Sequence, residues 1–199
     1  MLTKLLLATN NKGKVREYRR LLRGIPFEIV TPGEMGITRV VDEAGSSLEE
    51  NARLKAVVMA GESRLISLAD DSGLEVDALG GEPGPLSARY AGEGASDTGR
   101  INHLLARLKA VPREKRTARF RCVIAIATPD KRVELVSGEL KGLITLEPRG
   151  DQGFGYDPVF FLPEMGKTMA ELTLEEKNMV SHRARAAEKA REVLMKAGG

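Results

Sequence analysis

The sequence predicts an α/β fold, and two observations support this prediction. The chain opens in a strand–turn–helix–strand order, with an apolar run at 4–8, a polar turn, an amphipathic helix at about 14–22 and a short strand at 27–30. Residues 118–128 then alternate apolar side chains with Arg119 and Arg121, as a strand with one wetter face does. Segments 133–140 and 143–146 follow as partners in an antiparallel or mixed section, so we expect a mixed sheet.

Capping residues mark where the other helices begin. Ser47 and Glu50 have the spacing of a capping box, which opens a helix at 47–61. Asp97 is the expected N-cap of a helix from 98 to about 109, and Ser181 is that of the last helix. A second buried strand, 65–69, stands between the first two helices and the third and is expected to end at Asp70.

Length and composition predict one compact protein. The chain has 199 residues, of which 42% are hydrophobic, which is enough for a sizeable core within a single domain spanning 1–199. Its one cysteine, Cys122, excludes an internal disulfide. No apolar run is long enough for a signal peptide or a membrane span, so we expect no membrane partner and a cytoplasmic protein. A net charge of only +3 does not favour nucleic-acid binding.

The first polar segment at a strand end is Thr9-Asn10-Asn11-Lys12-Gly13-Lys14. Ligands bind at such edges in open α/β sheets. A turn that feeds a helix offers backbone N–H groups and the positive end of the helix dipole, and both favour a phosphate. The two lysines add positive charge, although the segment does not match a P-loop. Taken alone, it fits a solvated loop better.

The second segment is the acidic pair Asp70-Asp71, followed by Ser72 and Gly73. Two adjacent acids after a strand cannot both point the same way, so one can face a ligand while the other braces the structure. A carboxylate at a strand end suits Mg²⁺ and can accept a proton from an attacking water. An Asx-type turn closed by Gly73 explains the same residues equally well.

Two further segments lie in the C-terminal third. Closely spaced glycines beside Phe154, Tyr156 and Asp157 suit a loop that lets a flat ring approach, although a tight turn with core aromatics is the simpler explanation. His182 and Arg183 follow Ser181 in the first helical turn, where the dipole prefers anions. A ligand site often carries such a violation, and an exposed helix start explains it equally well.

Taken in order, these segments resemble the inosine/xanthosine triphosphate pyrophosphatase family, and the likeness runs from residue 5 to about residue 190. Many ordered motifs are far more specific than any one of them. The motifs that carry the resemblance are 9–14, 48–52 with Lys55, 69–79, 83–84, 87–92, 153–158, 170–172, 176–178 and 181–183.

The resemblance implies a homodimer of elongated, two-lobed protomers, each with a central twisted mixed β-sheet flanked by helices and a deep cleft between the lobes. It implies hydrolysis of ITP, dITP and XTP to monophosphate and pyrophosphate, with Mg²⁺ as cofactor. Asp71 would be the general base and a metal ligand. Glu43, with its neighbour Asp42 as the alternative, would be a second metal-associated acid.

The resemblance also assigns substrate contacts. Residues at 9–14 (Thr9, Asn10, Asn11, Lys12, Gly13 and Lys14) together with Lys55, Ser72 and Lys177 would hold the triphosphate. Phe154 would stack on the purine within its loop of Gly155 and Tyr156. Asp157, His182 and Arg183 would surround the edge of the base.

Three other functions compete with this one. A house-cleaning pyrophosphatase for other modified nucleotides could use a related fold. A nucleic-acid-binding module could use the basic stretch 113–121, but a solvated turn explains that stretch more simply. A non-catalytic regulator conflicts with the presence of Asp71, Lys14 and Lys177 together.

Overall fold

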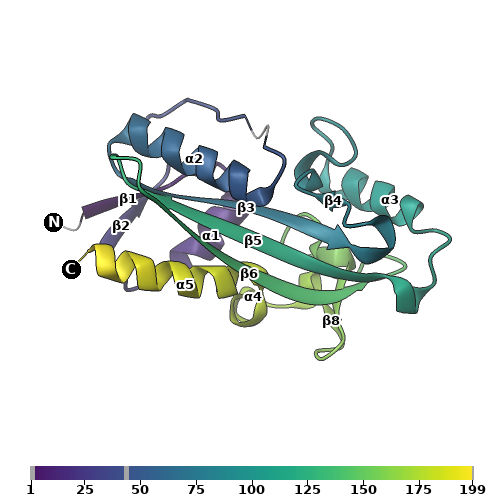
Figure 1. Ribbon diagram of the computed structural model, residues 1–199. Coiled ribbons are helices and arrows are strands. Elements are labelled where there is room, and N and C mark those ends of the chain that lie inside the picture. Colours follow the sequence, from purple (N-terminus) through teal and green to yellow (C-terminus); the bar gives the residue numbers. More distant parts are fainter. Residues whose placement is uncertain (1–2, 43–44, 199) are drawn as a thin grey trace. The chain divides into compact units, whose positions relative to one another are not determined.

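A computed structural model describes residues 3–42 and 45–198, and its architecture is α/β (Figure 1). The sheet has eight strands in the order β2-β1-β3-β5-β6-β7-β8, with β4 paired to β3. Strand β1 runs parallel to β2 and β3, whereas β6–β7, β7–β8 and β3–β4 are antiparallel. The predicted α/β fold with a mixed sheet is therefore confirmed.

The strands are β1 (Thr3–Leu7), β2 (Phe27–Val30), β3 (Ile66–Val76), β4 (Pro83–Gly84), β5 (Thr117–Ala127), β6 (Val133–Ile144), β7 (Phe160–Leu162) and β8 (Lys167–Thr168). The α-helices are α1 (Lys12–Leu21), α2 (Leu48–Ser63), α3 (Asp97–Arg107), α4 (Leu174–Val180) and α5 (His182–Ala197).

The chain divides into two compact units. Unit 1 comprises 1–71, 122–138 and 183–199, and unit 2 comprises 72–121 and 139–182. In unit 1, α2 covers one face of the strands and α1 and α5 cover the other (Figure 1). Each face has its own apolar cluster, one centred on Ala52, Ala56 and Ala60 of α2, the other on residues of α1 and α5. Ala187, Ala190 and Leu194 form an apolar stripe on α5 that is buried there.

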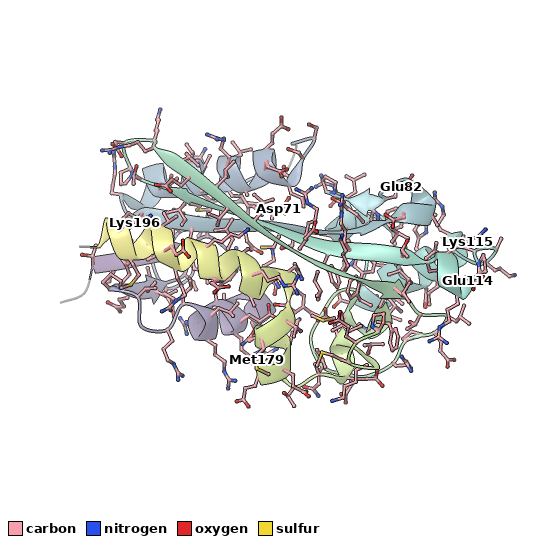
Figure 2. The ribbon with its side chains drawn as sticks, turned by 60° about the horizontal axis from the view of Figure 1, so that its bottom comes forward. Asp71, Glu82, Glu114, Lys115, Met179 and Lys196 are labelled. Atoms are coloured by element: carbon pink, nitrogen blue, oxygen red, sulfur yellow. The ribbon has the colours of Figure 1, made fainter. Side chains whose placement is uncertain are left out.

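Unit 2 has a single apolar cluster. Leu74 and Val76 of β3, Leu104 of α3 and Phe160 of β7 are buried in it. Arg116 lies beside this cluster, and its guanidinium donates to the backbone carbonyls of Leu108, Val111 and Thr145. One residue of the basic stretch is therefore a structural group, while residues 113–115 form an exposed turn on which Glu114 and Lys115 project (Figure 2).

Two strand boundaries differ from the prediction. Strand β3 does not end at Asp70 but continues to Val76, because Leu74 and Glu75 pair with β4. The alternative of an Asx turn closed by Gly73 is therefore wrong. Segments 133–140 and 143–146 are not partners, since β6 runs through the first of them to Ile144 as one strand.

Two of the three capping predictions need correction. Ser47 does cap α2 by accepting from the Glu50 N–H, but the Glu50 carboxylate accepts from the N–H and hydroxyl of Ser46, so the box is not reciprocal. The N-cap of α3 is Ser96, and Asp97 is the first helical residue. Ser181 ends α4 as its C-cap and directly precedes His182, the first residue of α5, so it also stands at the predicted N-cap position of the last helix.

Candidate active site

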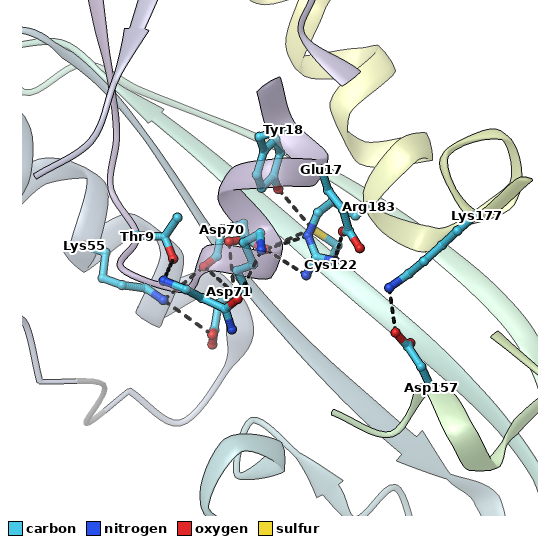
Figure 3. Close-up of polar contacts among 12 residues, drawn as sticks. Thr9, Glu17, Tyr18, Lys55, Asp70, Asp71, Cys122, Asp157, Lys177 and Arg183 are labelled. Atoms are coloured by element: carbon cyan, nitrogen blue, oxygen red, sulfur yellow. Dashed lines mark hydrogen bonds and ion pairs between the residues drawn. The ribbon is translucent and has the colours of Figure 1, made fainter. Parts of the chain in front are cut away.

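The acidic pair lies inside β3 of unit 1, where neighbouring side chains point to opposite faces of the sheet. Asp70 is 2% exposed and Asp71 is 5% exposed. The pleat of the strand therefore separates the two carboxylates, as predicted. The separation arises inside a strand, whereas a turn was expected at this place. Each acid has its own set of partners (Figure 3).

Asp70 is the centre of a buried charge network. Its carboxylate lies 2.9 Å from Lys14 Nζ and 3.3 Å from Arg183 Nη2. Burial opposes ionisation of Asp70, but the positive charges of Lys14, Arg183 and Lys55 outweigh it and hold the pKa of this carboxyl well below its ordinary value. Asp70 is therefore an anion that braces three cations, which agrees with the bracing role expected for one member of the pair.

Glu17 of α1 completes this network, and nothing in its sequence context pointed to it. Its Oε2 lies 2.7 Å from Arg183 Nη1, and both side chains are almost fully buried. Burial alone would lower the pKa of Arg183, but Glu17 and Asp70 outweigh it and raise that pKa well above its ordinary value. The Arg183 guanidinium is thus held by two carboxylates, and its predicted contact with a purine base finds no support in this arrangement.

Asp71 is held by Asn51 and shares Lys55 with Asp70. Asn51 Nδ2 donates to Asp71 Oδ2 at 3.0 Å, and Lys55 Nζ lies 3.6 Å from Oδ1. Asn51 is itself fixed, because its Oδ1 accepts from the Gly45 N–H at 2.8 Å. Asn51 was identified only as part of a motif; the structure shows that it orients the candidate catalytic carboxylate.

Two ammonium groups converge beside the acidic pair. Lys55 Nζ donates to the Asp70 carbonyl oxygen at 3.0 Å, and Lys14 Nζ lies 3.5 Å from the same oxygen. Lys14 belongs to the first turn of α1. Asn11, the N-cap of that helix, accepts from the Lys14 N–H. Lysine charge and a helix N-terminus with no acid in its first turn are therefore combined in unit 1.

The rest of the 9–14 turn has distinct positions. The Thr9 hydroxyl accepts from the Asn11 N–H at 3.2 Å, which closes the turn. Asn10 and Lys12 are exposed, and Gly13 is the second residue of the helix. Gly13 therefore has helical backbone and is not a turn glycine.

Unit 2 holds the aromatic loop. Asp157 Oδ2 accepts from the Phe154 N–H at 2.9 Å and lies 2.6 Å from Lys177 Nζ. Lys177 Nζ is also 4.7 Å from the centre of the Phe154 ring. Gly153 has φ +79°, and a Cβ there would lie 2.1 Å from Asp157 Oδ2, so only glycine fits. The half-buried Phe154 is thus presented beside an ammonium and a carboxylate.

Three more residues of unit 2 were predicted as substrate contacts, and each has different surroundings. The His182 ring stacks on Phe120 with centres 4.7 Å apart and is 4% exposed. Tyr156 belongs to the core, and its hydroxyl donates to the Ser87 carbonyl at 2.8 Å. The Tyr156 ring therefore does not form part of a binding surface, as the simpler explanation anticipated. Ser72 is half-buried in β3.

The residues present fit a magnesium ion that is shared with a substrate. Among residues 3–42 and 45–198, no three His, Cys, Asp or Glu side chains gather as a ready-made metal site. Mg²⁺ is often held by one or two carboxylates plus substrate phosphates, so Asp71 alone is compatible with it. The predicted second acid, Glu43, lies outside the described residues.

Comparisons with known proteins show the family of this chain. A model of the Ham1 family matches residues 5–193. The chain is 50% identical to the dITP/XTP pyrophosphatase of Desulforamulus reducens, over 96% of this chain and 95% of that protein. It is 53% identical to the protein of the same name from Geobacter sulfurreducens, over 93% of each chain.

Solved structures show the same fold. A HAM1 protein from Coxiella burnetii superposes with a TM-score of 0.89 at 40% identity, covering 98% of this chain and all of that one. The Ham1 protein of Staphylococcus aureus has a TM-score of 0.87 at 39% identity, with coverage of 98% and 100%. None of the helices in the described part of this chain has both the length and the apolar character of a membrane-spanning segment.

Proposed function

Since this chain belongs to the Ham1 family, we propose that it hydrolyses the non-standard purine nucleotides ITP, dITP and XTP to the monophosphate and pyrophosphate. The observation that carries the proposal is the convergence of Lys14 and Lys55 on the Asp70 carbonyl, beside the oriented carboxylate of Asp71. The dITP/XTP pyrophosphatase names of relatives about half identical in sequence support the choice of substrate.

The triphosphate is assigned to the start of α1, to Lys55 and to the residues around them. Lys14 and Lys55 supply positive charge, and the backbone and side chains of Thr9, Asn11 and the start of α1 supply donors. Phosphoryl-centre hydrolysis depends mainly on positioning and on charge stabilisation. The exposed Asn10 and Lys12, and Ser72 on β3, complete the proposed contacts.

Asp71 acts as the general base. A water held in line attacks the α-phosphorus, and Asp71 accepts the water's proton. The bond between the α-phosphorus and the α–β bridging oxygen breaks, and pyrophosphate leaves with that oxygen and the electron pair of the bond. Asn51 keeps the acceptor oxygen oriented, and Asp70 fixes the lysines. A bound Mg²⁺, held by Asp71 and by Glu43, would neutralise charge on the phosphate oxygens.

The purine is assigned to the loop that carries Phe154. Phe154 offers a face for stacking, while Asp157, Lys177 and His182 stand at the edge of the base. Lys177 was predicted as a phosphate ligand, but its contacts with Asp157 and Phe154 favour the base side. The backbone at Gly155 is also proposed to lie near the purine.

The preference for 6-keto purines follows from hydrogen bonding. A donor such as the Lys177 ammonium pairs with O6 of hypoxanthine or xanthine, whereas adenine presents an amino group at the same place. A desolvated donor–donor mismatch costs roughly 1–3 kcal/mol. Guanine also carries O6, so its rejection must arise near C2.

A panel of nucleotides tests the proposal. ITP, dITP, XTP, GTP, ATP, dUTP and methylated nucleotides would be compared for pyrophosphate release with and without Mg²⁺. We expect the first three to be preferred and the reaction to require the metal. Preference for a pyrimidine or a methylated nucleotide would favour the alternative house-cleaning activity instead.

The state of assembly and the location of the enzyme are also proposed. We propose a homodimer acting on the cytoplasmic nucleotide pool, as the family resemblance implies. Light scattering coupled to size exclusion should give about twice the chain mass of 21.6 kDa. A monomer that retains full turnover would contradict a functional dimer.

A further inference from the structure

We propose that Asp97, the first residue of α3, is a positioning residue that fixes Phe154 in the orientation needed to stack on the purine. The role of Phe154 in stacking on the purine rests on the proposed function, but the contact between Asp97 and the loop that carries Phe154 does not. Asp97 was expected only to cap a helix, a role that belongs to Ser96.

The contacts of Asp97 reach the aromatic loop. Asp97 Oδ2 accepts from the Gly155 N–H at 2.6 Å, although 58 residues separate them in sequence. On the other side of the ring-bearing residue, Asp157 Oδ2 accepts from the Phe154 N–H at 2.9 Å. These two N–H groups belong to the peptide planes before and after the Phe154 Cα. Holding both planes fixes φ and ψ of Phe154 and with them the direction of its side chain.

The loop needs such anchors because glycines flank the aromatic residue. Gly153 and Gly155 have φ of +79° and +64°. Glycine reaches many backbone conformations at little cost, so a loop with two of them has a broad ensemble unless it is tied. Asp157 ties one side by accepting from the Phe154 N–H, and Asp97 ties the other by accepting from the Gly155 N–H.

Asp97 is itself held in place by the start of its helix. Its Oδ1 pairs with Arg100, one turn further along α3. Arg100 also donates to the carbonyl oxygens of Ala88 and Ala95, in the segment that leads into the helix. The anchor is therefore built on a supported helix end, which is the arrangement that keeps a binding group in a precise position.

A tryptophan reporter tests the positioning directly. The chain contains no tryptophan, so Phe154→Trp gives a single fluorophore at the loop. In that background Asp97→Ala should raise the acrylamide quenching constant about twofold or more, because a lost hydrogen bond to a carboxylate widens the loop's ensemble. Asp97→Asn keeps an acceptor oxygen and should restore most of the protection. Glu93→Ala, an exposed acid in the same unit, is the charge-matched control and should leave quenching unchanged.

Kinetics test the consequence for the substrate. Asp97→Ala should raise KM for ITP about tenfold and leave kcat within about twofold, because stacking is lost while the chemistry at Asp71 is intact. In a Phe154→Ala background the same change should have little further effect, since the two residues act as one unit. Thermal melting of each variant checks that the protein remains folded.

Two results would overturn the inference. One is a quenching constant that Asp97→Ala leaves at its parent value. The other is an equal loss of kcat/KM from Asp97→Ala with and without the Phe154 ring, which would place its effect elsewhere. If the unmodified enzyme releases no pyrophosphate from ITP, the proposed function fails, and the fluorescence measurement alone decides the link between Asp97 and Phe154.

Discussion

Lys177 Nζ lies 2.6 Å from Asp157 Oδ2, and each side chain is only 4% exposed (Figure 3). The same ammonium stands 4.7 Å from the centre of the Phe154 ring. One cation therefore neutralises a buried acid and borders the aromatic platform. Removing either partner leaves an uncompensated buried charge, which costs more free energy than the pair itself contributes.

Lys177→Met should lower the free energy of unfolding by about 3 kcal/mol, because Asp157 remains buried and unpaired. Adding Asp157→Asn should recover part of this loss, since the stranded charge is gone. Denaturant titration measures both variants, with Lys115→Met as an exposed control. Additive losses in the double variant would contradict a coupled ion pair.

The two adjacent acids should separate into catalytic and bracing roles. Asp71→Asn keeps the shape but removes the proton acceptor and a metal ligand, so kcat should fall at least ~100-fold while stability changes little. Asp70→Asn should cost less turnover and more stability, because Lys14 and Arg183 lose their shared anion. Turnover of ITP and denaturant unfolding would be measured on both. A larger catalytic loss at Asp70 would reverse the assignment.

Stability should depend on pH through Asp70. The folded-state pKa of Asp70 is depressed, so its contribution is fully present above the unfolded-state pKa of about 3.9 and is lost as pH falls below that value towards the folded-state pKa. Between pH 6 and pH 3 the free energy of unfolding should fall more steeply for the unmodified protein than for Asp70→Asn. Parallel curves would show that Asp70 ionises alike in both states.

Arg183 should act on ITP and ATP equally. Its guanidinium is held by Glu17 and Asp70, so Arg183→Ala should reduce kcat/KM for both nucleotides by a similar factor and destabilise the fold by about 3–5 kcal/mol. Glu17→Gln should also lower kcat/KM for both nucleotides and destabilise the fold, each to a smaller extent. If Arg183→Ala instead reduces kcat/KM for ITP much more than kcat/KM for ATP, the result would support the predicted contact between Arg183 and the base.

Local patterns were enough to predict most of the fold. The opening strand–turn–helix–strand, the cap at Ser47 and the strand at 118–128 depend on residues close in sequence, and the structure has all three. The wetter face of that strand is limited to its first half, because Val123, Ala125 and Ala127 are buried. The extension of β3 past the acidic pair depends on pairing with β4, which no local pattern encodes. The same is true of β6, which runs through Gly142 as one strand.

The resemblance proposed the residues of the site but not the contacts between them. The resemblance identified Asp71, Lys55 and Phe154, and one motif contained Asn51 without a role. Glu17 was not found, because a single glutamate in an amphipathic helix is usually a solvated residue. Its burial depends on Arg183, which is 166 positions away. Asp97 was assigned to a cap for the same reason, since its partner Gly155 is distant in sequence.

The central claim is attack of water at the α-phosphorus of a deaminated purine nucleotide, and the products test it most directly. ITP would be incubated with the enzyme and Mg²⁺ in ¹⁸O-labelled water. The first products would be separated, and mass spectrometry would show which of them carries the label. The account predicts IMP carrying the label and unlabelled pyrophosphate, formed in one step, with ATP consumed far more slowly. Formation of IDP and labelled orthophosphate as the primary products would contradict it.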